Sequence, residues 1–181
     1  MALSLKMLDE VGLTPTGVTS PWTTGNEVEE DYAAAISRAF YEVFGSKDAW
    51  YFLHHSDPND PNAHPAVTKY EDGRRIVSIF ATFSDDFWQC INTPDKSEAF
   101  IRSVADFYIS EDGTKGELIR QLNGGSIWPV MITHWQSLYS NGLYTGLRAL
   151  DLVGQRIQKH LSDRVEWVDF TQLMNLSLAE S

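Results

Sequence analysis

The residues of this sequence that could do chemistry gather where apolar, strand-like runs come to an end. The run 128–133 leads directly into His134 and Trp135. Parallel α/β folds place catalytic and binding groups at strand ends, because the carboxyl ends of their strands share one rim. An imidazole there can transfer protons, and an indole can stack against a ring. His134 is therefore the first candidate for a catalytic residue, and Trp135 for a substrate contact.

Other strand-like runs end in polar or aromatic residues of the same kind. On a shared rim, residues that are far apart in the sequence would line a single pocket. Asp169, at the end of the last run, is the expected partner of His134 and the second catalytic candidate, with Asp85 and Asp86 next in line. The further candidates for substrate binding are Pro21, Trp22, His54, Asp85 and Asp86.

Each of these signals also has a structural explanation. A histidine at a strand end is more often a hydrogen-bonded structural residue, and adjacent aspartates can cap the segment that follows them. His54 and His55 point to opposite sides if their strand continues, so only one of them would face the pocket. Trp22, Trp88 and Trp135 are more often packing residues, although three near one rim suit stacking against sugar rings. The functional reading therefore depends on the shared location.

A metal site is an alternative use of the same side chains. Catalytic zinc takes three protein ligands and keeps an open water position. The chain offers these ligands: His54, His55, His64, His134, Asp85 and Asp86. Their spacing favours no particular set, because a proline-rich loop separates His55 from His64. The sequence by itself therefore assigns no metal ligands.

The elements that must position these residues alternate between strand and helix patterns. Strands are expected at residues 14–20, 49–54, 75–83, 128–134 and 165–170, and a loop at residues 56–72. Helices are expected at residues 2–11, 26–44, 94–109, 117–122, 143–161 and 171–178. Because helical patterns rather than hairpin turns follow the strands, all five strands are predicted to be parallel. The expected fold is a single α/β domain over residues 1–181.

Composition limits the classes of partner. A net charge of −11 without a cluster of Lys and Arg argues against nucleic acid. The sequence has no apolar stretch near 18 residues and no signal-peptide pattern, so we expect no membrane partner and, by default, a cytoplasmic location. Cys90 is the only cysteine, which rules out a disulfide within the chain.

Two segments resemble polysaccharide deacetylases, the NodB-homology family. Residues 12–22, Gly-Leu-Thr-Pro-Thr-Gly-Val-Thr-Ser-Pro-Trp, are similar to the family segment in which a helix gives way to a strand and a proline-containing active-site loop. Residues 132–134, Ile-Thr-His, followed by a long helix and a final strand at 165–170, resemble the end of the family's domain. By element order the resemblance covers nearly the whole chain, but its motifs are short.

The resemblance implies a distorted (β/α) barrel of about seven strands that removes acetyl groups from N-acetylated sugars with a bound divalent metal, zinc or similar. His134 would then be the general acid on the leaving amine, with Pro21 and Trp22 in the substrate loop. The family's metal-binding Asp and His residues and its base Asp precede the segment that corresponds to Gly12, and this chain has no counterpart of them. Asp85 and Asp86 imitate the acidic motif but come too late in the strand order.

We therefore expect an incomplete or distorted (β/α) barrel with about five parallel strands, corresponding to the C-terminal portion of a deacetylase-like barrel. Such a chain is a fragment or a member without hydrolytic activity, and by itself it should not hydrolyse acetylated sugars at an enzymatic rate. If its native N-terminus is missing, its cellular location is undetermined. An exposed sheet edge would favour association with another copy. The alternative function is a non-catalytic carbohydrate-binding or subunit-interaction domain.

Overall fold

The computed structural model describes residues 1–19, 26–53, 65–125 and 128–181, with only the backbone for residues 26–29. The chain divides into two compact units. The first, which we call the sheet unit, comprises residues 1–57, 63–81 and 168–181. The second, which we call the helical unit, comprises residues 58–62 and 82–167. We describe each unit by itself.

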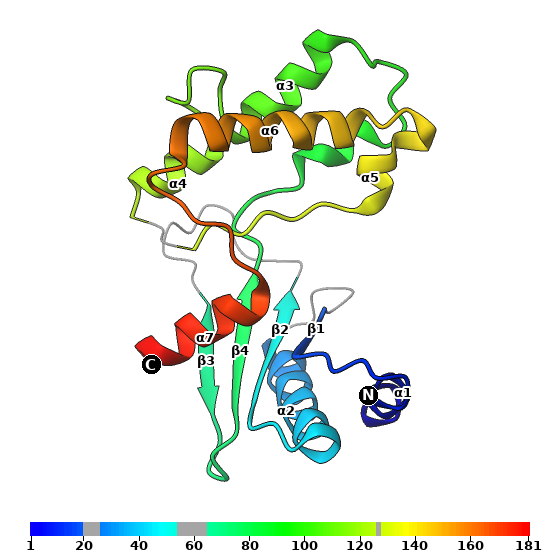
Figure 1. Cartoon of the computed structure of the whole chain (residues 1–181), viewed down its shortest axis with the longest axis vertical. Helices are drawn as coiled ribbons and strands as arrows, with labels where there is room; N and C mark the ends of the chain where they lie inside the picture. Colours follow the sequence, from blue (N-terminus) through cyan, green and yellow to red (C-terminus); the bar gives the residue numbers. More distant parts are fainter. Residues whose placement is uncertain (20–25, 54–64, 126–127) are drawn as a thin grey trace. The chain divides into compact units, whose positions relative to one another are not determined.

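The sheet unit combines four strands with three helices (Figure 1). Its elements are α1 (Ala2–Glu10), β1 (Gly17–Thr19), α2 (Asn26–Phe44), β2 (Asp48–Leu53), β3 (Ala66–Lys69), β4 (Arg75–Phe80) and α7 (Phe170–Glu180). The strand order is β1-β2-β4-β3. β1 and β4 both pair with β2 in parallel, whereas β3 pairs with β4 antiparallel. The unit is therefore an α/β structure with an open, mostly parallel sheet.

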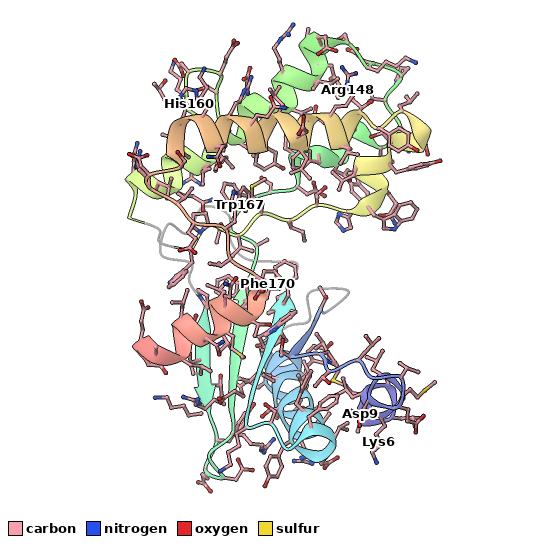
Figure 2. All side chains as sticks on the ribbon, in the orientation of Figure 1. Lys6, Asp9, Arg148, His160, Trp167 and Phe170 are labelled. Atoms are coloured by element: carbon pink, nitrogen blue, oxygen red, sulfur yellow. The ribbon has the colours of Figure 1, made fainter. Side chains whose placement is uncertain are left out.

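The two faces of the sheet are covered by different helices. Alternate residues of a strand point to opposite faces, and in β2 the buried Ala49, Tyr51 and Leu53 belong to the core that includes the α2 residues Ile36 and Phe40. The intervening β2 residues meet α7. The ring of Phe170, labelled in Figure 2, lies 5.0 Å from that of Trp50 and 5.2 Å from that of Phe52.

Two strand predictions and one loop prediction need correction. Residues 128–134 are not a strand, because the carbonyl of Thr82, which could have continued a ladder, accepts from Gln121 Nε2 at 2.6 Å instead. Val130 reaches Thr82 through a single backbone bond of 2.9 Å and through the threonine hydroxyl. Residues 165–169 are likewise not a strand, and α7 follows them. The loop expected at 56–72 contains β3, which joins β4 through a turn at Gly73 (φ 81°).

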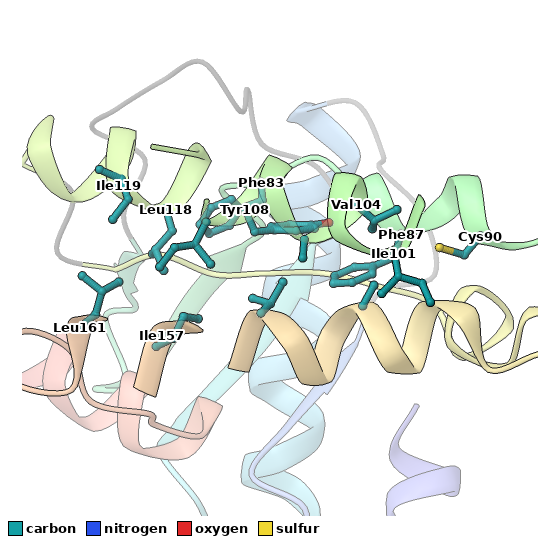
Figure 3. Close-up of a cluster of buried hydrophobic side chains, with 14 residues drawn as sticks. Phe83, Phe87, Cys90, Ile101, Val104, Tyr108, Leu118, Ile119, Ile157 and Leu161 are labelled. Atoms are coloured by element: carbon teal, nitrogen blue, oxygen red, sulfur yellow. The ribbon is translucent and has the colours of Figure 1, made fainter. Parts of the chain in front are cut away.

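The helical unit packs around α3 and α6. Its elements are η1 (Asp86–Cys90), α3 (Glu98–Tyr108), α4 (Glu117–Asn123), α5 (Trp135–Tyr139), η2 (Ser140–Gly142) and α6 (Thr145–Leu161). Figure 3 shows the core, in which the Tyr108 ring stacks on Phe87 at 4.7 Å. Cys90 is fully buried beside them, and burial raises the pKa of its thiol to about 11. The thiol is therefore protonated at neutral pH, and it packs as an apolar group.

None of the helices among the described residues is both long enough and apolar enough to cross a bilayer.

Candidate functional site

The structure places the predicted site residues in three groups. Pro21, Trp22 and His54 lie outside the described residues, as do His55 and His64 from the proposed metal ligands. Four candidates belong to the helical unit: Asp85, Asp86, His134 and Trp135. Asp169 belongs to the sheet unit.

His134 and Asp85 form the centre of the candidate site. Both precede short helices, His134 as the residue before α5 and Asp85 as the residue before η1. His134 Nδ1 lies 2.8 Å from Asp85 Oδ2, although the two residues are separated by 49 positions. The histidine side chain is 35% exposed and the aspartate side chain 12%. A carboxylate thus holds the imidazole while the ring stays accessible from solvent.

Asp169, the first-choice partner of His134 in the sequence prediction, has a different interaction. Its side chain accepts a hydrogen bond from the backbone N–H of Gln172 at 2.8 Å, and Gln172 Oε1 accepts from the Asp169 N–H at 2.9 Å. This reciprocal pair is a capping box at the start of α7. The carboxylate that binds His134 is therefore Asp85, the second choice.

The other carboxylate oxygen of Asp85 is unusual. Oδ1 is buried and has no hydrogen-bond partner among the described residues. A buried carboxylate oxygen without a partner costs roughly 1–3 kcal/mol or more, so native structures keep such atoms where a ligand, an ion or water can bond to them. The orphaned oxygen is thus a second indication, independent of His134, that this place binds something.

Trp88 completes the surroundings of the imidazole. Its ring lies 5.0 Å from that of His134 in an edge-to-face arrangement at 74°, and 55% of the residue is exposed. Asp85 and Trp88 both lie at or next to η1, so this short helix restrains His134 from two directions. An exposed indole beside an accessible imidazole is suited to contact a ring-shaped ligand.

Tyr108 supports the site from the core, and the sequence did not single it out. The backbone N–H of Asp86 donates to the Tyr108 hydroxyl at 2.9 Å, and that hydroxyl donates to the carbonyl of Ser84 at 3.3 Å. Burial raises the pKa of Tyr108, so the hydroxyl keeps its proton. The only signal in the sequence was a tyrosine on an otherwise apolar helix face, where a buried hydroxyl must find a partner.

The surroundings of Asp86 disfavour its ionised form. Burial raises the pKa of Asp86, the charge of Asp85 raises it further, and a hydrogen bond from Gln89 Nε2 at 2.5 Å partly offsets both. The ionised form of Asp86 therefore costs stability at neutral pH. This cost is absent below the ordinary pKa of an aspartate and develops as the pH rises to the folded-state pKa.

We expect Asp86→Asn to stabilise the chain at pH 7, because asparagine removes the desolvated charge and can still accept from Gln89. The gain should shrink as the pH falls to about 3, below the ordinary pKa of an aspartate, where the carboxyl group is protonated in both the folded and the unfolded chain. Denaturant unfolding of native and variant chains at the two pH values measures the difference. A variant that is less stable than the native chain at pH 7 would contradict the argument.

The described residues do not provide a set of ligands for the metal ion that the family resemblance implies. Among the described residues, no three His, Cys, Asp or Glu side chains are grouped so that they could hold an ion. Asp85 and Asp86 adjoin His134 but do not make such a group with it. The described residues therefore do not fit the metal centre that the resemblance implies.

The geometry supports acid–base chemistry at His134. An Nδ1–H bond to a carboxylate fixes the tautomer and orientation of an imidazole, with Nε2 as the atom that exchanges a proton. Asp85 is placed to do this for His134. Comparison of the chain with protein-family models, with curated proteins and with solved structures finds no match.

Proposed function

We propose that the chain carries the sugar-binding and proton-transferring part of a carbohydrate deacetylase, with His134 delivering a proton to the leaving amine of an N-acetylated sugar. The observation that carries the proposal is the 2.8 Å hydrogen bond between His134 Nδ1 and Asp85 Oδ2. It gives the histidine of the family-like segment the carboxylate partner that a general acid requires. The exposed rings of Trp88 and Trp135 next to it suit a sugar.

In this proposal each residue has a limited role. Asp85 orients the imidazole, and His134 delivers a proton from Nε2 to the leaving amine. Trp88 restrains the imidazole through its edge-to-face contact. Proton transfer by one positioned group contributes about 10²- to 10⁴-fold to a rate.

For the fold we propose that the parallel run β1-β2-β4 is part of an incomplete or distorted (β/α) barrel. Its support is the parallel pairing of these strands and the edge position of β1. An open edge presents unpaired backbone groups, and a second copy of the chain is the partner we propose for it.

A second function, a non-catalytic carbohydrate-binding or subunit-interaction domain, is favoured by one observation. Two large aromatic side chains, Trp88 and Trp135, are 55% and 69% exposed near His134. Exposed indoles can bind a sugar without any chemistry. A deacetylase and a carbohydrate-binding domain would both bind a sugar, but only the deacetylase would release acetate from it.

The first test is binding of N-acetylglucosamine, followed through the indole N–H resonances of the chain. We expect saturable changes at Trp135 that disappear in Trp135→Ala. The matched control is Trp167→Ala, which removes another indole of the helical unit that is 65% exposed and should leave the affinity unchanged. No binding by the native chain would reject both carbohydrate functions.

The second test is acetate release from N-acetylated oligosaccharides with added zinc, cobalt or nickel. From the sequence we expect no release at an enzymatic rate by this chain alone. Metal-dependent turnover that falls about 10²- to 10⁴-fold in His134→Ala would contradict that expectation and establish the catalytic function. Turnover that His134→Ala leaves unchanged would remove His134 from its role.

A further inference from the structure

Asp85, the residue that holds His134, lies at the centre of a three-residue turn. The N–H of Asp86 donates to the carbonyl of Ser84 at 3.0 Å, and Asp85 between them has φ −78° and ψ 82°. This is the geometry of an inverse γ-turn, in which one hydrogen bond joins residues two positions apart. The turn sets the direction in which the Asp85 side chain leaves the backbone, and with it the place of the carboxylate.

A single side chain from the core contacts both ends of this turn. The hydroxyl of Tyr108 accepts a hydrogen bond from the N–H of Asp86 at 2.9 Å and donates one to the carbonyl of Ser84 at 3.3 Å. These groups belong to the two peptide bonds that flank Asp85. Because they are already bonded to each other across the turn, the hydroxyl is not needed to satisfy them. It adds a second restraint on the conformation of the turn.

The hydroxyl has a defined position because the ring that carries it is held on several sides. Tyr108 belongs to α3 and is fully buried, and its ring stacks on that of Phe87 at 4.7 Å (Figure 3). The Phe107 ring meets it edge-on at 5.0 Å. Any backbone group could satisfy a buried hydroxyl. The partners of this hydroxyl flank the one residue that binds the imidazole, and a positioning role requires this arrangement.

The carboxylate of Asp85 has no other hydrogen-bond partner among the described residues. Asp85 is the residue before η1, where an aspartate commonly caps the helix, yet its side chain makes no cap bond there. Its Oδ2 lies 2.8 Å from Nδ1 of His134, and its Oδ1 has no partner. Because the carboxylate binds through one oxygen only, a small change in the turn would alter its distance from the imidazole.

We propose that Tyr108 is a positioning residue for the proton-transferring pair: its hydroxyl fixes the turn at Asp85, and the turn fixes the carboxylate that orients His134. This inference rests on the proposed function, because that function gives the pair its role in proton transfer. It extends the site to a side chain that is fully buried in the core. A misplaced carboxylate reduces the fraction of chains in which the imidazole has the productive orientation.

The test follows the imidazole of His134, assigned with His134→Ala, in nitrogen–proton NMR correlation spectra at about pH 9, well above the ordinary pKa of histidine. The ratio of the Nδ1–H to the Nε2–H tautomer reports how well the carboxylate holds Nδ1, and it requires neither sugar nor metal. We expect the Nδ1–H tautomer to predominate in the native chain. In Tyr108→Phe, which keeps the ring, the ratio should fall roughly two- to tenfold, the effect of one hydrogen bond. Asp85→Ala removes the acceptor and should lower the ratio further.

The controls separate positioning from a general loss of stability. Ile101→Val removes one methylene group from the same helix and the same core at a similar cost in stability. Its side chain makes no hydrogen bond, so the tautomer ratio should stay the same. His160, whose Nε2 lies 3.0 Å from the carbonyl of Glu111, is a reference in the same spectra. Protection of the buried Cys90 from thiol reagents verifies that each variant is folded.

The outcomes distinguish this inference from the proposed function. A ratio that Tyr108→Phe leaves unchanged, or that Ile101→Val lowers by as much, overturns the positioning role while the pair and the proposed function stand. A native chain without an excess of the Nδ1–H tautomer overturns the pair itself, and with it both proposals. A ratio that Asp85→Ala leaves unchanged does the same.

Discussion

Tyr108→Ala should destabilise the helical unit by about 3–5 kcal/mol, the range measured for deleting a fully buried aromatic ring. Tyr108 is completely buried and stacks on Phe87. The substitution removes the ring and also leaves the N–H of Asp86 and the carbonyl of Ser84 without their hydroxyl partner. Tyr108→Phe keeps the ring and should cost only about 1–2 kcal/mol, the value of the lost hydrogen bonds.

The stability of these variants can be measured through the reactivity of the Cys90 thiol. Cys90 is the only cysteine of the chain and lies fully buried in the same core, so thiol labelling under denaturant titration reports the opening of the helical unit. Trp167→Ala, at an exposed position of the same unit, should stay within about 0.5 kcal/mol of the native chain. If Tyr108→Ala were as well protected as this control, the packing argument would be wrong.

Gly146→Ala should be the second strongly destabilising change, by about 1–3 kcal/mol or more. A Cβ at Gly146 would lie 2.2 Å from the carbonyl oxygen of Ser137 and 3.0 Å from the Cα of Leu138. Backbone cannot yield as a flexible side chain can, so α5 must move away from α6. Because α5 carries Trp135, the same substitution should weaken saccharide binding.

Gly154→Ala is a matched control in the same helix. A Cβ at Gly154 meets nothing within 4 Å. Alanine in a helix interior is favoured over glycine by about 0.5–1 kcal/mol, so this variant should be slightly more stable than the native chain. Unfolding curves of the two variants should therefore shift in opposite directions. Shifts of the same sign would show that helix propensity, not the contact with Ser137, decides the outcome.

The helices were the most predictable part of the fold. Long apolar periodicity placed α2 and α6 close to their observed bounds, since a repeated pattern over many residues is hard to obtain by chance. The face of α6 was less predictable. Leu147 is apolar but 48% exposed, whereas Arg156 is buried and donates to Asp106 and to the carbonyl of Ile109. Because these partners of Arg156 are 50 and 47 positions away in the sequence, no local pattern indicates that the arginine is buried.

The predicted strands that formed are those that have a neighbouring strand to pair with. β2 and β4 are parallel as predicted, and they are neighbours whose mostly apolar residues are buried between two helix layers. Residues 128–134 have the same apolar character but no ladder, because the backbone carbonyl of Thr82 bonds to Gln121. Strand formation depends on a partner with free backbone groups, and composition does not report whether one exists.

The candidate site was predicted in part. His134 and its need for a carboxylate followed from residue types, and Asp85 was among the named candidates. The preference for Asp169 assumed that residues 165–170 form a neighbouring strand, whereas Asp169 instead begins a helix with a capping box, so a role for it beside His134 stays a prediction. Its Gln172, three positions later, is the sequence signature of that box. The left-handed backbone at Ser140, Asn141 and Tyr144 gave no signal, since such a conformation at non-glycine residues cannot be seen in a sequence.

The division of the chain has a consequence for its synthesis. The sheet unit is discontinuous in sequence, with α7 added after residue 167, whereas the main segment of the helical unit, 82–167, is continuous. On the ribosome, the strands emerge first but lack the helix whose Phe170 covers Trp50 and Phe52. The main segment of the helical unit, which emerges in one stretch, can therefore fold before the sheet is covered on both faces. The nascent chain exposes an aromatic sheet face for the time needed to add about a hundred residues, on the order of 5–20 s. That interval is when it would need protection from aggregation by a chaperone.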